Sequence, residues 1–102
     1  MKKTELDKLQ EYLISRRISH ERIDERNRHQ ICVPEDGLYC RWDVICHRGS
    51  YGYEEGLLEI YGDIVDWRKD GDSVVGWLTA EDVIRRVEGL YASKGNRNRS
   101  NC

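Results

Sequence analysis

Two amphipathic helices enclose a long stretch with strand periodicity in this chain, and that order limits the fold more than any other feature of the sequence. The first helix pattern begins after Thr4, and Asp7 follows three residues later, which is the spacing of a capping box with Asp in the usual Glu position. Apolar residues spaced by three and four then predict one buried face for packing on a sheet. That face carries Leu6, Leu9, Leu13 and Ile14.

The second helix pattern begins after Thr79, which is the predicted N-cap, with Asp82 at the third helical position. Leu78 and Val83 have the spacing of a hydrophobic staple across this start. The buried stripe of the helix is predicted to be Val83, Ile84, Val87 and Leu90.

Between the helices, four segments have the residue types and alternation of strands. They are 18–25, which is polar enough for a sheet edge, 29–33, 41–47 and 57–61. Residues 73–77 are expected to form a short extended approach to the second helix. Residues 93–102 are expected to form a disordered basic tail, because they have nothing apolar to bury. We therefore expect a single α+β domain over 1–92, with a roughly four-stranded, mainly antiparallel sheet and both helices packed on it.

The length of 102 residues allows one modest core and no second domain. No apolar run approaches the roughly 18 residues that a membrane-spanning helix needs, and the first residues are polar rather than typical of a signal peptide. We therefore expect a cytoplasmic location and no membrane partner. Reduced thiols are expected there for Cys32, Cys40, Cys46 and Cys102.

The net charge of -2 hides an uneven distribution of charge along the chain. Residues 1–30 contain 8 basic and 6 acidic residues, 31–82 contain 4 and 12, and 83–102 contain 5 and 1. The middle segment therefore carries a charge of -8, which repels a nucleic-acid backbone and suits a basic partner surface. A solvated acidic face is the plainer interpretation of the same pattern.

Thiols and imidazoles are ligands that zinc prefers, and Cys32, Cys40, Cys46 and His47 lie close in sequence. No Cys-x-x-Cys pair occurs among them, and Cys32 and Cys46 fall on predicted strands among apolar neighbours, where cysteine behaves as a small hydrophobic residue. Cys46 and His47 point to opposite faces of a strand, so the histidine is poorly placed as a base for the thiol. We therefore expect no metal, no cofactor and no enzymatic activity.

Asp43 and Glu59 fall on consecutive predicted strands, a pattern that resembles the restriction-endonuclease-like nucleases, which have an Asp on one strand and Glu-x-Lys on the next. This resemblance implies a metal site and a lysine that assists the attacking water. Tyr61 stands in place of that lysine, so the metal site would keep only two carboxylates. Asp43 and Glu59 are better explained as residues on the polar face of an antiparallel pair.

The glycine-rich loop 47–56 has the composition of a binding loop. Its Tyr51 and Tyr53 offer rings for stacking, and Arg41, His47 and Arg48 offer donors for phosphate. A hairpin loop whose tyrosines fold back over the sheet is the alternative.

The three tryptophans are expected to divide between core and surface. Trp42 and Trp77 are predicted to lie in the core, because the chain has no phenylalanine and the core needs other large apolar side chains. Trp67 lies among charged residues and is predicted to be partly exposed, where a tryptophan can anchor an interface.

The chain resembles small accessory proteins of phages and mobile elements in Gram-positive bacteria. The resemblance lies in the residue pattern of four segments, 33–34, 41–47, 52–62 and 76–84. The resemblance implies a protein that opposes host defence. Such proteins bind a CRISPR nuclease, sometimes as acidic mimics of nucleic acid, or trap a nucleotide messenger.

The leading hypothesis is a non-enzymatic phage or mobile-element protein that inhibits a bacterial defence system in the host cytoplasm. It would dock its acidic middle segment on a CRISPR-Cas nuclease or on another nucleic-acid-binding protein with a basic surface. The predicted contact residues are Tyr51, Tyr53, Glu54, Glu55, Asp63, Asp66, Trp67, Asp70 and Asp72.

Interpretations from other classes stay open at this point. One is a sponge for a nucleotide-derived immune messenger, bound by Arg41, His47, Arg48, Tyr51 and Tyr53. Another is a small nucleic-acid-binding regulator that uses solvent-facing basic residues, namely Arg85, Arg86, Lys94, Arg97 and Arg99. A structural or assembly protein, for example a homodimer, is the remaining interpretation.

Overall fold

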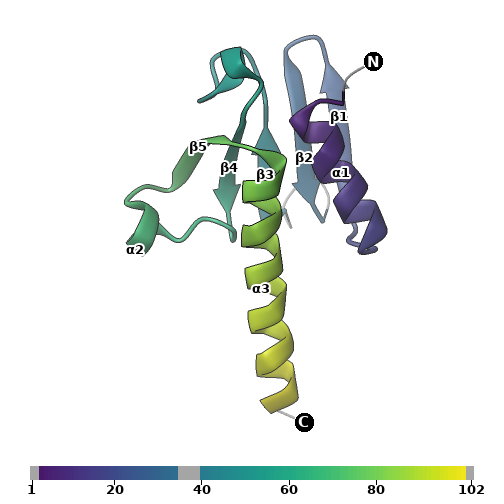
Figure 1. Cartoon of the computed structure of the whole chain (residues 1–102), viewed down its shortest axis with the longest axis vertical. Coiled ribbons are helices and arrows are strands. Elements are labelled where there is room, and N and C mark those ends of the chain that lie inside the picture. The colour runs from purple at the N-terminus through teal and green to yellow at the C-terminus, as the bar shows by residue number, and fades with distance from the viewer. Residues whose placement is uncertain (1–2, 35–39, 101–102) are drawn as a thin grey trace.

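The computed structural model describes residues 3–34 and 40–100, with the backbone alone for 93–100, and consists of one antiparallel sheet that carries a long helix from each end of the chain (Figure 1). The α+β class is as predicted. The helices are α1 (Glu5–Ser15), the short α2 (Trp67–Asp70) and α3 (Ala80–Ser100), with a 3-10 turn η1 (Tyr53–Glu55). The strands are β1 (Glu21–Glu25), β2 (Arg28–Val33), β3 (Trp42–Ile45), β4 (Leu58–Gly62) and β5 (Val74–Leu78).

The strands lie in the sheet in chain order, from β1 at one edge to β5 at the other, and each pairs antiparallel with the next. The sheet has five strands rather than roughly four, because the segment expected as an extended approach to the last helix pairs with β4. Leu58 of β4 lies opposite Leu78 of β5, and the pairing is irregular after Leu58. Gly76 and the exposed Trp77 interrupt the apolar alternation of β5, so its sequence pattern is weak.

The polar sequence of β1 predicts an edge strand, and the structure confirms this position. Its polarity has a structural cause, because Arg22 binds α1. The guanidinium of Arg22 donates to Asp7 Oδ1 at 2.7 Å and to Gln10 Oε1 at 3.1 Å. Hydrogen bonds therefore join this edge strand to the helix, whereas the central strands contact the helices through apolar side chains.

Both predicted capping boxes form. At α1, Asp7 N–H donates to Thr4 Oγ1 and Thr4 N–H donates to Asp7 Oδ2, each at 3.0 Å. At α3, Asp82 N–H donates to Thr79 Oγ1 at 3.1 Å and Thr79 N–H donates to Asp82 Oδ2 at 3.0 Å. Each box satisfies two backbone donors at the start of its helix, which fixes where the helix begins.

The starts of α1 and α3 are also joined to each other. Ala80 N–H, a donor without an acceptor inside its own helix, donates to Glu5 Oε1 at 2.8 Å. Hydrogen bonds from the Lys8 side chain and from this backbone N–H hold the pKa of Glu5 below its usual range. An ionised carboxylate from the first helix therefore caps the last one, where the helix dipole favours negative charge.

The core lies between the two long helices and the face of the sheet that they cover. α1 contributes Leu6, Leu9 and Leu13 as predicted, whereas Ile14 is 61% exposed. Ile14 is rotated by about 100° from Leu13 around the helix, so it cannot share the face that packs on the sheet. Trp42 is buried, as expected. The other buried apolar residues of this core are Ile31, Val33, Val44, Leu58, Ile60, Ile64, Ala80, Val83 and Val87.

The second face of the sheet carries the residues that alternate with the core. Asp43 of β3 lies opposite Tyr61 of β4, and Ile45 lies opposite Glu59. On this second face Gln30 and Cys32 are buried, Asp43 and Glu59 are half-buried, and Tyr61 is exposed.

α3 continues to Ser100, so residues 93–100, expected in a disordered tail, are helical in the structure. Each residue that extends a helix already nucleated adds a backbone hydrogen bond without needing a buried face, and the expectation of disorder came from the lack of apolar residues to bury. Residues 101–102 lie outside the described residues. The acidic segment 63–72, between β4 and β5, contains a further helical turn, α2.

Candidate functional site

The loop between β3 and β4 folds against β5, and two glycines allow this approach. A Cβ atom on Gly76 would lie 2.2 Å from Tyr51 Cβ. A Cβ atom on Gly52, whose φ is +94°, would lie 2.9 Å from Leu57 Cβ and 3.1 Å from Trp77 Cα. Only glycine lets the two backbones meet at these points. Gly52 and Gly76 therefore allow the loop to pack directly on β5, at the edge of the sheet.

Tyr51 and Trp77 form a stacked pair at this contact, with ring centroids 5.1 Å apart and planes 30° from parallel. Trp77 N–H donates to the Tyr51 carbonyl at 3.3 Å, and Tyr51 N–H donates to Glu59 Oε1 at 2.9 Å. Yet Tyr51 is 55% exposed and Trp77 is 57% exposed. The prediction that Trp77 lies in the core is therefore wrong.

The exposure of Trp77 follows from its backbone, which leaves regular strand geometry. Its φ is +56°, a conformation that costs a residue other than glycine about 1–2 kcal/mol. The irregular pairing of β4 with β5 occurs in the same part of β5. As a result the indole lies against the loop, and the neighbouring Leu78 packs against the core instead.

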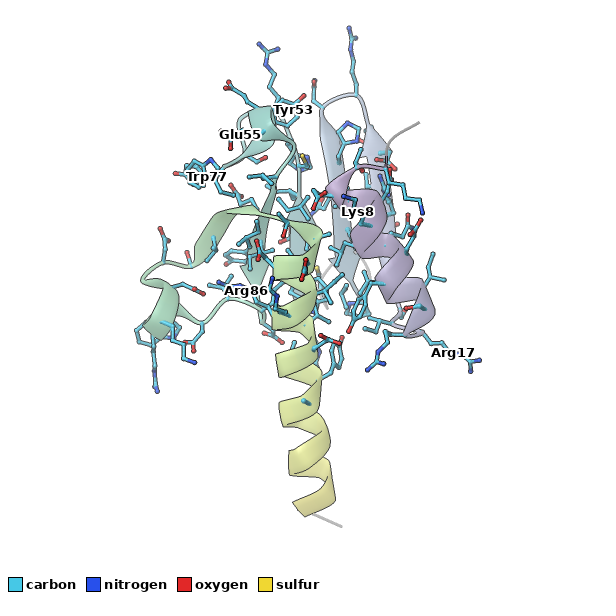
Figure 2. The ribbon with its side chains drawn as sticks, in the orientation of Figure 1. Lys8, Arg17, Tyr53, Glu55, Trp77 and Arg86 are labelled. Atoms are coloured by element: carbon cyan, nitrogen blue, oxygen red, sulfur yellow. The ribbon has the colours of Figure 1, made fainter. Side chains whose placement is uncertain are left out.

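A pocket of about 350 Å³ lies beside this aromatic pair and is lined by Trp77 and by residues 48–55. Figure 2 shows Tyr53, Glu55 and Trp77 at the same end of the molecule. Glu54 and Glu55 are exposed, and neither side-chain carboxylate has a hydrogen-bond or ion-pair partner within 3–34 and 40–92. We call this site the η1 pocket. It brings together four of the predicted contact residues, Tyr51, Tyr53, Glu54 and Glu55, and adds Trp77.

A second aromatic and acidic group surrounds α2, which Figure 1 shows beyond the β5 edge of the sheet, away from η1. Asp66 is the N-cap of α2, and its Oδ1 accepts from Arg68 N–H at 3.1 Å. Trp67 is 67% exposed, as predicted, and the Arg68 guanidinium lies 5.5 Å from its ring centroid in a cation–π contact. Asp63 and Asp72 are also exposed.

Asp70 differs from the other predicted contact residues, because its carboxylate is used inside the protein. Arg86 Nη1 and Nη2 each donate to one oxygen of Asp70 at 2.9 Å, and Nη1 also donates to the Ile64 carbonyl at 3.1 Å. The Asp70 side chain is 15% exposed, and the hydrogen bonds from Arg86 hold its pKa below the usual range. The expectation that Arg86 faces solvent is therefore wrong, since docking of α2 on α3 covers it.

The residues predicted to bind a nucleotide messenger do not meet at one site. Arg41 precedes β3, whereas His47 and Arg48 follow it, which separates them by about 20 Å along the strand. The His47 ring is also occupied by a hydrogen bond inside the protein, because its Nδ1 accepts from the backbone N–H of His29 at 2.7 Å. Burial lowers the pKa of His47, which disfavours the positive charge that would attract a phosphate. Arg48 is the member of this cationic set that lies beside Tyr51.

The basic residues predicted for a nucleic-acid-binding regulator are likewise divided. Arg85 is exposed on α3, whereas Arg86 is engaged with Asp70. The side chains of Lys94, Arg97 and Arg99 lie outside the described part of the chain.

Asp43 and Glu59, which resemble the acids of a nuclease, each bind a neighbouring group. Asp43 Oδ2 accepts from Gln30 Nε2 at 2.6 Å, and Glu59 Oε1 accepts the Tyr51 N–H. In the described ranges, no group of three or more His, Cys, Asp or Glu side chains is placed to hold a metal ion.

Cys32, Cys40 and Cys46 form no disulfide with one another. Cys32 is buried, as predicted for a small hydrophobic residue, whereas Cys40 and Cys46 are half-buried. Burial raises the pKa of Cys46, so its thiol is a poor nucleophile near neutral pH. Cys102 lies outside the described residues.

The predictions from sequence missed Trp77, which lines the η1 pocket, and Glu59, which binds the backbone of the loop that forms it. A signal for Trp77 was present, because a glycine inside a strand, here Gly76, marks a close backbone approach. Glu59 has no such local signal, since its partner is the N–H of Tyr51 in the preceding loop.

The fold and the site define a small α+β protein with an exposed aromatic pair, in which Trp77 has a strained backbone, beside unpaired carboxylates. No protein-family model matches the chain, and no curated protein or solved structure matches it. None of the helices in the described residues combines the length and apolar character needed to cross a bilayer.

Proposed function

We propose that this protein is a non-enzymatic binding protein that docks the η1 pocket and the surrounding acidic surface on a basic surface of a partner protein. The observation that supports this most directly is Trp77, which has φ +56° and a side chain 57% exposed. Backbone strain and apolar surface left in water both oppose folding. Strained residues of this kind concentrate at functional sites.

The aromatic pair has the properties of an interface anchor. Tryptophan and tyrosine are enriched among the residues that dominate binding energy at protein interfaces. Tyr51 and Trp77 are already stacked and hydrogen-bonded through the backbone in the unbound protein. Little side-chain freedom would therefore be lost when a partner covers them.

Carboxylates around this pair favour a basic partner. Glu54 and Glu55 are exposed in the η1 pocket, and Asp63, Asp66 and Asp72 extend the negative charge around α2. Opposite charges on two surfaces accelerate association and select the partner more than they add affinity. Trp67 would provide a second anchor in the α2 region.

The resemblance to accessory proteins of phages and mobile elements supports a particular setting for this binding. In that setting the protein acts in the cytoplasm of a bacterial host. The partner is a nucleic-acid-binding protein of a defence system, such as a CRISPR-Cas nuclease. The acidic surface would inhibit it by occupying a basic groove in place of nucleic acid.

Affinity capture from an extract of a Gram-positive host, followed by mass spectrometry, tests the role of the aromatic pair. The wild-type protein is expected to retain a basic nucleic-acid-binding protein. Trp77→Ala is expected to weaken retention by at least tenfold, because loss of a central interface tryptophan costs about 2 kcal/mol or more. Ile14→Ala, which trims a similarly exposed side chain on α1, should retain as much as the wild type. Equal retention by the wild type and Trp77→Ala would contradict the proposal.

The acidic residues are tested with the captured partner in a binding-rate measurement at several salt concentrations. Glu54→Gln combined with Glu55→Gln should slow association several-fold at low salt and reduce its salt dependence. Glu11→Gln is the matched control, because Glu11 is an exposed carboxylate on α1 that pairs with Lys3. A salt dependence unchanged by the double substitution would argue against docking through these carboxylates.

A further inference from the structure

The η1 pocket combines aromatic rings with an excess of carboxylates, and this combination selects the chemistry of its occupant. Its volume of about 350 Å³ falls in the range of sites that take a small ligand or a single side chain. Its lining includes three rings, two carboxylates and one guanidinium, from Tyr51, Tyr53, Trp77, Glu54, Glu55 and Arg48.

A cation suits this lining better than an anion does. A phosphate would gain one guanidinium, that of Arg48, but would stand close to Glu54 and Glu55. A cation gains both carboxylates and also the negative faces of the aromatic rings. The net charge of the lining therefore favours a positively charged occupant.

The α2 region shows how a guanidinium contacts an exposed indole in this protein. Arg68 lies over the Trp67 ring, 5.5 Å from its centroid. Trp77 has the Tyr51 ring as its stacking partner, and among residues 3–34 and 40–92 no cation lies over its ring. More than half of the Trp77 side chain is exposed, so it offers aromatic surface to a cation from another molecule.

We propose that the η1 pocket takes an arginine side chain of the partner protein, with its guanidinium on the exposed aromatic surface of Trp77 and its N–H groups donated to Glu54 and Glu55. Arginine suits the site better than lysine, because a planar guanidinium stacks on rings and donates to two acceptors at once. This assignment rests on the proposed function and names the group on the partner that the site recognises.

The pocket is formed before any occupant arrives, which favours recognition of a single side chain. Gly52 and Gly76 set the loop against β5, and the hydrogen bond from Tyr51 N–H to Glu59 holds its backbone. No loop closure is needed to assemble the rings, so binding does not have to order them.

Titration of the full chain with N-acetyl-arginine N-methylamide, followed through the Trp77 indole N–H resonance in nitrogen–proton correlation spectra, tests this assignment. A saturable shift is expected, with a Kd on the order of 1–10 mM for so small a ligand. The citrulline analogue, which has nearly the same shape without the charge, should bind at least fivefold more weakly. Glu54→Gln with Glu55→Gln should weaken arginine binding to the same extent. Glu11→Gln with Glu25→Gln, which neutralises two exposed acids on α1 and β1, should leave it unchanged.

Any of four results would overturn the assignment: no binding of the arginine analogue, equal binding of the arginine and citrulline analogues, tighter binding of the lysine analogue, or a shift of Trp77 by adenosine monophosphate but not by the arginine analogue. The capture experiment separates this outcome from failure of the proposed function. If Trp77→Ala still abolishes capture while the arginine analogue does not bind, the docking surface is supported and the arginine assignment is wrong. If Trp77→Ala leaves capture unchanged, the proposed function itself falls.

Discussion

Replacement of Gly62 by alanine is expected to lower the free energy of unfolding by about 3 kcal/mol or more. Gly62 ends β4 with φ +98°, where a residue other than glycine already costs about 1–2 kcal/mol. A Cβ atom there would also lie 2.4 Å from the Arg41 carbonyl oxygen and 2.7 Å from Trp42 Cα. Both are backbone atoms that cannot rotate away, and Trp42 is the largest fully buried side chain of the core. Relief of the clash would therefore move β3 against β4.

Denaturation in urea measures this effect, and Gly49→Ala is its matched control. Gly49 has φ +93°, close to that of Gly62, but a Cβ atom on it would have no neighbour within 4 Å. Gly49→Ala should therefore cost only the conformational part, about 1 kcal/mol. If the two variants lost equal stability, the close approach of the β3 backbone to Gly62 would not be the cause.

Breaking the pair between Asp70 and Arg86 is expected to lower the free energy of unfolding by about 2 kcal/mol, because hydrogen bonds between charged groups contribute more than neutral ones. Arg86→Met keeps much of the side-chain length and removes the donors to Asp70 and to the Ile64 carbonyl. Arg85→Met is the control on the same helix, since the Arg85 side chain is 66% exposed and its nearest acid contacts are 3.5 Å long. Exposed pairs of that kind contribute about 0–1 kcal/mol. Equal losses from the two arginines would contradict the anchoring of α2 by Arg86.

The same pair predicts a dependence of stability on pH. The pKa of Asp70 in the folded protein lies below its usual value of about 4, chiefly because Arg86 donates hydrogen bonds to the carboxylate. The contribution of the pair is therefore fully present above about pH 4 and is lost as the pH falls through the lowered pKa. Asp70→Asn should flatten this acid part of the stability curve. Asp72→Asn, whose carboxylate among the described side chains accepts only from the neighbouring Ser73, should leave the curve unchanged.

The elements that the sequence predicts well are those that local residues define. The two capping boxes require only Thr and Asp three positions apart, and the leucines of α1 need only helical spacing, so both are visible in the sequence. β5 is not visible in this way, because its pairing with β4 is irregular and Gly76 serves the contact with Tyr51 rather than the strand. Contacts between segments that are distant in sequence, such as the contact of Gly76 with Tyr51, are seen only in the structure.

The same distinction applies to the candidate site. Tyr51, Tyr53, Glu54 and Glu55 belong to one loop, so their composition already indicates a binding segment, and their function as contacts stays a prediction. The sequence could not show that Trp77 joins them, because this requires β5 to lie under the loop. It also could not show that Asp70 is unavailable, since the partner of Asp70 is on α3, 16 residues later.

The hydrogen bond from Ala80 to Glu5 has a practical consequence for immobilising the protein. Glu5 lies in the first turn of α1, and Ala80 follows Trp77 by three residues. A fusion attached ahead of Thr4 that disturbs this carboxylate would loosen the start of α3, and with it the strand end that carries the exposed indole. Figure 1 shows the far end of α3 extending away from the sheet. An affinity tag placed after α3 therefore leaves the proposed binding surface undisturbed.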